Sequence, residues 1–551
     1  MVHSPRQLPE QSHRLDAIRR TQSHFGWTDT VIMFSNSTGT DSRVQRWYDA
    51  ALILTAIALP FSNFLMSQGA FLLVIAWGVD RWKNGPLFRG RTWSYWQAQP
   101  VLWAVLALYS WELLSQLWST DWAYGWRVLR IQLPLLAFPL ILTTARWDQR
   151  LGLQRVQAAL AVAVIAACGS CLWMGMQKSG ELKPRDWSPF ISHIRFSLII
   201  TFTWGWWLIR WFKSRKQVAL LVLLLITILG GWFTWKTASL TGAILFPLIL
   251  LVASWQFLQL RRAVLGLCIA GVVTLGAVAW HLLPIYPEAH TLEAKTPRGE
   301  AYVNHSDRCL RENGTHIWVH IAWNELNEAW SSRSALDFNG QDERNQELRM
   351  TLIRFLASKG LKKDADGVSA LSDEEIRWIE EGIPTVLEKT RRGLRRRLDV
   401  IQFEVWNARD GGNPSGHSLV QRFAFLDAAR HIYQQHPVLG VGIGDLPHNY
   451  DAAYSALDSP LDEEFRLRAH NQYITFLVAG GPMNLILWLV LLAALIPLNS
   501  RRSDYPTSAA VVFLVVIALS CLTEDTLETQ AGVTFAGFFI GLFGRRQPAQ
   551  V

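Results

Sequence analysis

The sequence predicts an all-α integral membrane protein with about twelve transmembrane helices and a large, mainly helical outer loop. Three observations support this class. Of 551 residues, 50% are hydrophobic and 28 are tryptophan. The mean hydropathy is nevertheless only slightly positive, so the apolar residues must be concentrated in blocks. These blocks recur along the chain and are interrupted by one long hydrophilic insertion, residues 285–469.

Each apolar block is long enough to cross about 30 Å of hydrocarbon as a helix rising about 1.5 Å per residue. The expected spans are residues 47–63, 66–81, 100–118, 127–144, 153–177, 194–212, 217–234, 238–258, 262–284, 474–498, 507–523 and 531–545. Only a short turn near Ser62 and Asn63 separates the first two spans, so a re-entrant pair is an alternative there.

Positive charge in the short connections predicts the orientation. Residues 1–46 are polar and basic without the features of a secretory signal, which indicates a cytoplasmic tail. With this tail inside, every inner connection is basic, whereas the outer connections WSTDWAYGW and TEDTLET contain no lysine or arginine. The chain is therefore expected to be N-in and C-in, with the insertion outside the cytoplasm, which is the periplasm if the cell is Gram-negative. The resulting domains are 1–46 (cytoplasmic tail), 47–284 (nine spans), 285–469 (periplasmic loop), 470–546 (three spans) and 547–551 (cytoplasmic tail).

The insertion divides into two helical parts. From 317 to 409, apolar residues recur every three or four positions, and Leu348, Leu352, Ile353 and Leu356 make one such face. Ser372, followed by three acidic residues, predicts a helix start. The second part contains RFAFLDAARHIYQQHPVLGVGIGD, a predicted helix ending in a glycine-rich turn. These glycines lack dinucleotide spacing, so we expect them to let the backbone approach another element or a lipid-linked ligand closely.

The net charge of +9 does not indicate a nucleic-acid partner, because most cations lie in the predicted inner connections and the insertion. The basic run Thr390–Asp399 is interpreted either as a contact to anionic lipid heads or as a solvated helix face. No histidine or cysteine spacing predicts a metal site, and the first outer loop, SNFLMSQ, carries no carboxylate. We therefore expect no metal and no cofactor.

Two segments carry a family resemblance. RFAFLDAARHIYQQHPVLGVGIGD, followed by HNQYITFLVAGGPMNLILWL, resembles the signature of the O-antigen ligase and polymerase superfamily. SHIRFSLII and NELNEAWSSRSALDFNGQDERNQELRMTLIRFLASKG resemble its Bacteroidetes-type version. The resemblance covers residues 47–545 and is most specific between Arg422 and Gly481. It implies a membrane-embedded, inverting, metal-independent glycosyltransferase. Such an enzyme moves a glycan from undecaprenyl diphosphate, in the inner membrane, to an acceptor hydroxyl; ligases use lipid A-core.

The chemistry implied by the resemblance needs cations for the leaving diphosphate and a base for the acceptor hydroxyl. Arginine grips phosphate through two parallel hydrogen bonds, and neutral histidine accepts a proton near neutral pH. By analogy with the family, Arg195 and Arg422 bind the diphosphate and His470 is the general base. Asn471 and Tyr473 are candidates for supporting these groups.

Simpler interpretations stay open at each position. Arg195 could anchor the sixth span at the interface, Arg422 could be a solvated loop cation, and His470 could cap the tenth span. At the level of function, a polymerase or a protein-glycosylating enzyme of the same superfamily is the nearest alternative. A polysaccharide or lipid transporter is the non-enzymatic one, although no repeated half or matched pair of broken helices favours it.

Overall fold

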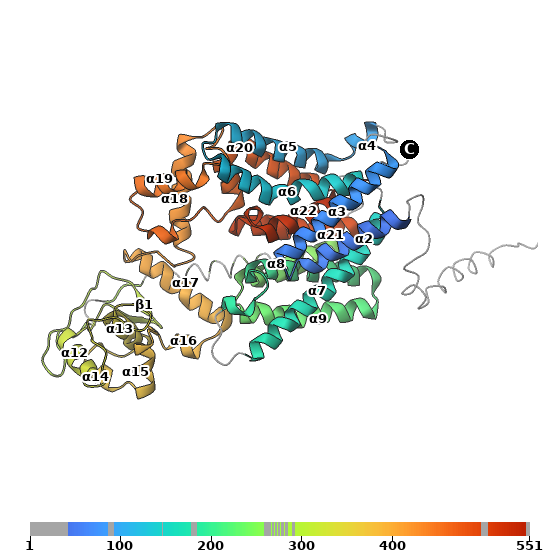
Figure 1. The fold of residues 1–551 in the computed structure, drawn as a ribbon. Coiled ribbons are helices and arrows are strands. Elements are labelled where there is room, and N and C mark those ends of the chain that lie inside the picture. Colours follow the sequence, from blue (N-terminus) through green and yellow to red (C-terminus); the bar gives the residue numbers. More distant parts are fainter. Residues whose placement is uncertain are drawn as a thin grey trace, which may run out of the picture.

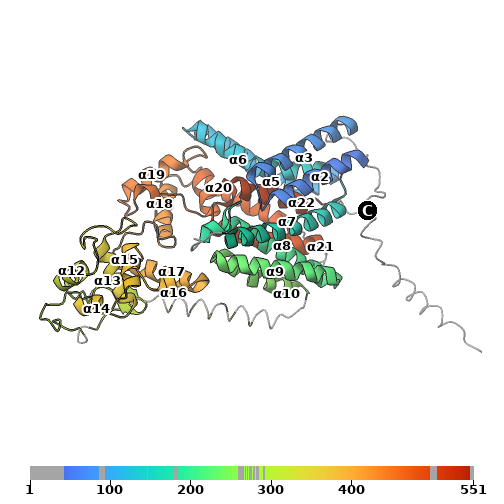
Figure 2. The ribbon, with the colours of Figure 1, turned by 60° about the horizontal axis from the view of Figure 1, so that its bottom comes forward.

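The computed structural model describes residues 42–85, 93–145, 147–177, 184–257, 285–288, 292–496 and 505–546, with isolated residues between 266 and 280. In this part of the chain the structure is mainly helical (Figure 1). A bundle of long apolar helices carries, at one end, a small unit formed by α18 and α19. A separate domain lies beyond that end in both views (Figures 1 and 2).

The bundle is formed by apolar helices from both ends of the sequence. They are α2 (Ser42–Ala58), α3 (Asn63–Asn84), α4 (Trp93–Gln97), α5 (Pro100–Ser115), α6 (Trp122–Thr144), α7 (Gln149–Gln177), α8 (His193–Ser214), α9 (Gln217–Lys236), α10 (Leu240–Phe257), α20 (Gln472–Ala494), α21 (Tyr505–Thr523) and α22 (Gln530–Gly544). Short 3-10 helices add η2 (Gln116–Trp118), η3 (Pro184–Trp187) and η6 (Thr526–Glu528).

Helices cover eleven of the twelve expected spans within the described residues, and the ninth, 262–284, lies mostly outside them. Six described helices, α3, α5, α6, α7, α9 and α20, are long and apolar enough to cross a membrane, and α10, α21 and α22 are shorter apolar helices. The first two expected spans form a closely packed pair, α2 and α3. In the turn between them, the Ser62 hydroxyl caps the start of α3. Twelve spans remain an expectation.

Aromatic rings hold the centre of the bundle together. Phe202 of α8 lies 4.5 Å from the ring of Phe539 in α22, and Trp206 lies 5.6 Å from Phe543 (centroid distances). Glycine brings α22 against α6, since a Cβ at Gly537 would lie 2.4 Å from the carbonyl oxygen of Pro134. These contacts hold α22 within the bundle, and its N-cap residue, Thr529, belongs to the candidate site.

The outward faces of several bundle helices are apolar. On α9, Val218 and Ile228 are each 67% exposed, and Leu221 is 60% exposed. A contiguous apolar surface of this kind is unfavourable in water but favourable against lipid tails. The exposed apolar faces therefore fit a protein that resides in a membrane.

The insertion contains a hairpin and eight α-helices in the described residues. They are β1 (Arg311–Glu312), antiparallel to β2 (Thr315–His316), then α12 (Trp323–Ser331), α13 (Leu348–Ser358), α14 (Ala365–Ser369), α15 (Asp373–Glu380), α16 (Leu387–Thr390), α17 (Gly393–Arg409), α18 (Gln421–Gln435) and α19 (Leu446–Ala456), with the 3-10 turn η5 (Glu463–Phe465).

Residues 292–410, which we name the outer domain, have their own hydrophobic core. The predicted face of Leu348, Leu352, Ile353 and Leu356 is fully buried in it, which confirms that prediction. Ser372 begins α15 through a capping box with Glu375, as the sequence predicted. The hairpin and the long turns between helices were not predicted.

The basic run Thr390–Asp399 is largely paired within the insertion. Arg391 contacts Asp399 at 2.6 Å, Arg396 contacts Glu388 at 3.6 Å, and Arg397 contacts a glutamate of α17 at 3.7 Å. Because these arginines are partly exposed and already paired, the contacts favour a solvated helix face over a contact to anionic lipid heads.

The unit formed by α18 and α19 packs against the bundle. Its core includes Val478 and Ala479 of α20. The glycine turn runs along α20, where Val441 N–H donates to Val478 O (2.9 Å) and Gly442 N–H donates to Ala479 O (2.8 Å). A Cβ at Gly440, which has φ +68°, would lie 2.5 Å from Val478 O. The glycines therefore allow close approach to another element, the first of the two expected reasons.

Candidate functional site

Arg422 and His470 meet on one carboxylate, that of Glu524 at the C-terminal end of α21. Arg422 Nη2 lies 3.3 Å from Glu524 Oε1, and His470 Nδ1 lies 3.8 Å from Glu524 Oε2. The second distance is that of an ion pair and longer than a hydrogen bond. All three side chains are partly exposed, with His470 at 32%. The structure thus brings two of the three main sequence candidates together.

Arg195, near the start of α8, contacts the segment that follows Glu524. Its Nε donates a 2.8 Å hydrogen bond to the hydroxyl of Thr529, at the N-terminus of α22. The charges of Glu524 and Asp525 lie close enough to act on this guanidinium. Among the described residues, no hydrogen bond engages the terminal nitrogens of Arg195. The side chain is therefore fixed at Nε and keeps its fork of donors for another acceptor.

Arg422 is positioned by α18, and a polar clamp fastens the following glycine turn to the bundle. The carboxylate of Asp445 accepts hydrogen bonds from Thr120 N–H (2.8 and 2.9 Å), Thr120 Oγ1 (2.9 Å) and Asp121 N–H (2.8 Å). Gly444 N–H donates to Ser119 Oγ at 3.0 Å. Because the clamp joins α19 to the connection between α5 and α6, it fixes the unit that carries Arg422.

His470 has a strained backbone directly before α20. Its φ of +48° lies in the left-handed region, which is uncommon for a residue other than glycine. The ring lies 5.6 Å from that of Phe425 in α18 (centroids). Six other non-glycine residues in the described chain also have a positive φ, so His470 is assigned to the site from its position beside Glu524.

Asn471, not His470, caps α20. Its side-chain oxygen accepts from Tyr473 N–H (3.1 Å) and Ile474 N–H (3.2 Å). The Tyr473 hydroxyl donates to Ala518 O in α21 at 2.9 Å, so it does not reach Glu524. Both residues hold the start of α20 in place, and neither contacts the Arg422–Glu524–His470 group in the described hydrogen bonds.

A break inside α20 also shapes this end of the bundle. Gly480 and Gly481 are non-helical, and Gly481 has φ +68°. A Cβ at Gly481 would lie 2.2 Å from Val438 O. The freed carbonyl of Gly480 accepts from Trp111 Nε1 at 2.8 Å. The break therefore keeps its backbone groups satisfied while letting the glycine turn lie against α20.

The acidic segment 524–529 is the part of the site that the sequence candidates omitted. Besides Glu524, it holds Asp525, which accepts from Thr475 Oγ1 (2.6 Å), and Glu528, which pairs with Arg468 Nη1 (3.1 Å). Burial alone would lower the pKa of Arg468, but the charge of Glu528 raises it above its usual value. A signal existed: TEDTLET, an expected outer connection, contains three acids and no cation.

A buried acidic residue of the bundle lies near the acidic segment. Glu112 of α5 is 1% exposed, and neither of its carboxylate oxygens has a hydrogen-bond partner among the described residues. Glu528 and Asn484 are near enough to interact with it. A carboxyl group in this position is unfavourable in a membrane span and is often functional. In the sequence, Glu112 is the only charged residue within the apolar run 100–118, and this is the signal that could have identified it.

The candidate site lies where the predicted outer connections gather. Thr120 belongs to one of those connections, and Glu524 and Thr529 belong to another. All three contact residues of the insertion or of α8. Within the described part of the chain, no group of three or more histidine, cysteine, aspartate or glutamate residues is arranged to hold a metal ion.

The chain matches no family model, and it matches no curated protein. The family resemblance therefore depends on the quoted motifs.

Proposed function

We propose that this protein is an O-antigen ligase-like glycosyltransferase of the bacterial inner membrane. It transfers a glycan from undecaprenyl diphosphate to a hydroxyl of lipid A-core, on the periplasmic side. The single observation that carries the proposal is the convergence of Arg195, Arg422 and His470 on residues 524–529 at one end of the bundle. The twelve-span, N-in and C-in arrangement is part of the same proposal.

The proposed step is a direct displacement at the anomeric carbon. The acceptor oxygen attacks that carbon, the bond to the diphosphate oxygen breaks, and the configuration inverts. Undecaprenyl diphosphate leaves with the bonding electrons, and the acceptor proton moves to His470 Nε2. Because charge develops on the diphosphate, guanidinium groups at its oxygens stabilise the transition state more than the ground state.

Glu524 has two parts in this proposal. Its carboxylate lies 3.8 Å from Nδ1, where its charge stabilises the imidazolium that forms when Nε2 takes the acceptor proton. It also neutralises Arg422 before the donor arrives, and the diphosphate then competes for that guanidinium. The terminal nitrogens of Arg195 are the other phosphate contact.

A transfer assay tests the proposal. Purified protein in lipid nanodiscs receives a glycan on undecaprenyl diphosphate, with lipid A-core or a second carrier-linked glycan as acceptor, in the presence of EDTA. We expect transfer to lipid A-core by the wild type and loss of transfer in Arg195→Ala, Arg422→Ala and His470→Ala. Unchanged turnover in all three variants would remove the site assignment. Extension of the carrier-linked glycan alone would identify a polymerase.

The nearest alternatives have separate readouts. Transfer to a protein side chain would identify a protein-glycosylating enzyme. Movement of a labelled lipid across vesicles without cleavage of the donor would identify a transporter. Deletion of the gene adds a cellular test: ligation predicts loss of capped lipopolysaccharide with carrier-linked polymer accumulating, whereas single-repeat caps indicate a lost polymerase.

A further inference from the structure

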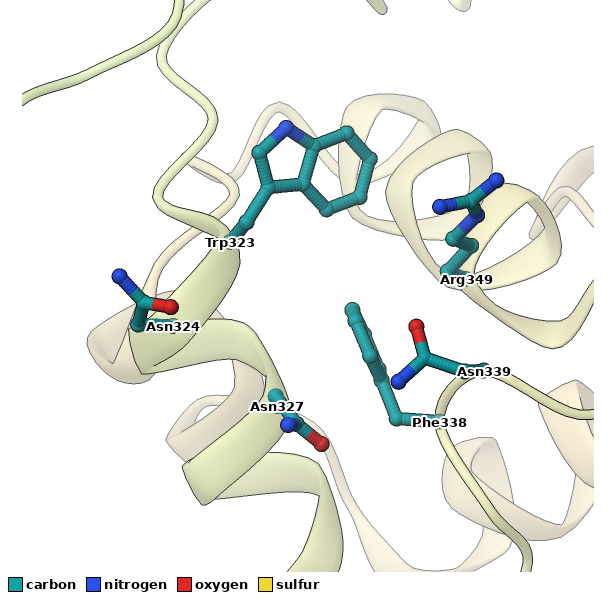
Figure 3. A pocket seen from close by; sticks show the side chains of 6 residues that line it. All are labelled: Trp323, Asn324, Asn327, Phe338, Asn339 and Arg349. Carbon is teal, nitrogen blue, oxygen red and sulfur yellow. The ribbon is translucent and has the colours of Figure 1, made fainter.

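A cavity of about 250 Å³, which we name the outer cavity, opens on the outer domain. It is lined by Trp323, Asn324, Asn327, Phe338, Asn339 and Arg349 (Figure 3). Helix α12, which supplies the first three of these residues, lies on the side of the outer domain turned away from the bundle (Figures 1 and 2). The outer cavity is therefore separate from the site around Glu524.

Backbone hydrogen bonds fix the frame of the outer cavity. At the start of α12, the carboxylate of Glu300 accepts from Asn324 N–H (3.0 Å) and Glu325 N–H (2.8 Å). In the turn before α13, Asn339 N–H donates to Asp337 Oδ1 at 3.0 Å. At the start of α13, Leu348 N–H donates to Gly340 O at 3.1 Å. The side chains that line the cavity are thus presented by a frame that is already formed.

Two neighbouring aromatic rings, those of Trp323 and Phe338, line the cavity (Figure 3). The rings of Trp323 and Phe338 have centroids 6.3 Å apart and planes inclined at 64°. Phe338 is only 4% exposed and belongs to the core of the outer domain, so its position is fixed. The result is a small apolar wall in an otherwise polar cavity.

Three amide side chains stand around these rings. Asn324 and Asn327 are three residues apart on α12 and so share a face of the helix, and Asn339 lies across the cavity (Figure 3). All three residues are exposed. In the described part of the chain, no hydrogen bond engages the side-chain amides of Asn324 or Asn339. The Asn327 oxygen accepts from Ser331 Oγ at 3.4 Å. An amide has one acceptor oxygen and two donor hydrogens without a net charge, so all three side chains can donate to a ligand.

The remaining lining residue is a cation that already has a partner. Arg349 Nε donates to Glu347 Oε2 at 3.2 Å, and its Nη2 lies 3.1 Å from the same oxygen. Its guanidinium carbon also lies 6.0 Å from the centre of the Trp323 ring. Because the charge is balanced, the cavity is suited to an uncharged polar ligand more than to a phosphate.

We propose that the outer cavity binds a short, uncharged segment of a glycan. A pyranose ring has an apolar C–H face that packs on an aromatic ring, and its hydroxyls both donate and accept around the rim, as the amides do. The volume is below the ~300 Å³ at which pockets for drug-sized ligands begin, so a short segment fits better than a folded peptide.

This inference rests on the proposed function only for the source of the glycan, which is either the donor or the acceptor. A site remote from the reacting atoms binds substrate and transition state alike. Loss of the outer cavity is therefore expected to raise KM for the glycan that it binds and to leave kcat unchanged.

Saturation-transfer NMR on the full-length protein in nanodiscs tests the inference. The two probes are lipid-free core oligosaccharide and lipid-free O-polysaccharide fragments from the source strain. The test variant is Asn324→Ala/Asn327→Ala, whose alanines suit a helix. The control is Glu328→Ala, an exposed change on the same helix that does not line the cavity. A second variant, Trp323→Ala, removes the aromatic wall, and thermal unfolding checks that each variant is folded.

We expect at least one probe to bind the wild type and Glu328→Ala equally. Binding is expected to weaken about ten-fold or more in the double variant, because hydrogen bonds to the hydroxyls are lost. Binding of the core oligosaccharide assigns the outer cavity to the acceptor, and binding of the polysaccharide assigns it to the donor. No binding of either probe, or equal binding by the folded variants, would contradict the inference. Glycan binding without any transfer would support the inference and contradict the proposed function. Transfer with an unaltered KM in the variants would support the proposed function and contradict the inference.

Discussion

The site at the end of the bundle and the outer cavity differ in the kinds of side chain that form them. The first gathers charged side chains from segments far apart in the sequence, since Arg195 meets Thr529 and Arg422 meets Glu524. The second takes neutral amides and aromatic rings from one stretch, Trp323–Arg349. Charge suits a diphosphate, and uncharged amides suit sugar hydroxyls. The difference suggests a division of work between the reaction and recognition of the substrate.

The largest expected effect is at His470. Asparagine tolerates a positive φ better than most residues, so His470→Asn should keep the backbone and remove the base. We expect the transfer rate to fall by about 10²- to 10⁴-fold, the usual contribution of a positioned general base. The measurement is kcat in the nanodisc assay. The control is His448→Asn, an exposed histidine of α19. A variant at His470 that retains the wild-type rate would show that this end of the bundle is not where the proton moves.

The two arginines should come next. Hydrogen bonds to charged groups contribute about 1.5–3 kcal/mol, which corresponds to roughly 10- to 100-fold in kcat/KM. We expect a loss of this size in Arg195→Ala and in Arg422→Ala, with lysine recovering part of it because the charge returns without the planar fork. Arg430→Ala, an exposed change on α18, is the control. Equal losses in all three alanine variants would mean that surface charge in general, and not these two guanidiniums, attracts the donor.

A smaller effect is expected at Glu524. Glu524→Gln keeps the shape and removes the charge shared by Arg422 and His470. We expect kcat/KM to fall about ten-fold, and we expect the change to be non-additive with Arg422→Ala, because residues in one ion-pair network are coupled. A double-mutant cycle in the transfer assay measures this coupling. If the effects of Glu524→Gln and Arg422→Ala on kcat/KM are strictly additive, Glu524 does not act together with Arg422.

The outer domain should differ from the bundle in its response to acid. Burial, with the charges of Arg311 and Lys363, lowers the pKa of His316 to about 4, and burial lowers that of Lys363 to about 7. Both groups bind fewer protons folded than unfolded, so stability falls as pH decreases from 10.5 to 7 for Lys363 and from 6.5 to 4 for His316.

Hydrogen exchange on the intact protein, corrected for intrinsic rates, measures this response. We expect protection in the outer domain to fall between pH 8 and pH 5 by more than protection in α6 and α22. His316→Gln should reduce the loss below pH 6.5. A pH response that is the same in both regions, or unchanged by the substitution, would contradict this prediction.

The smallest effects concern the start of α20. Asn471→Ala should lower the stability of the protein by about 1 kcal/mol because the cap of α20 is lost, whereas Asn471→Asp retains it. Tyr473→Phe removes one hydrogen bond to Ala518 and should also lower stability by about 1 kcal/mol. Thermal unfolding in nanodiscs measures both, and transfer by the folded Tyr473→Phe should stay near the wild-type rate. A large catalytic loss in Tyr473→Phe would place its hydroxyl in the reaction.

The sequence predicted local features better than it predicted partners. Helical periodicity located the buried face of Leu348 and Leu352, and the polarity of Ser372 located a helix start, because both signals lie within a few residues. Glu524 was not chosen, since its role depends on the approach of Arg422 from α18 and no local pattern encodes that contact. The break at Gly480 and Gly481 was missed although Pro482 follows them directly, and a Gly-Gly-Pro run is a local signal for a break in a helix.

Cryo-electron microscopy of the protein with undecaprenyl diphosphate in nanodiscs tests the central claim most directly. We predict density for the two phosphates within hydrogen-bond distance of the Arg195 and Arg422 guanidiniums, with His470 Nε2 open to the space beside them. Density for the diphosphate at the opposite end of the bundle, or bound without either arginine, would contradict the account.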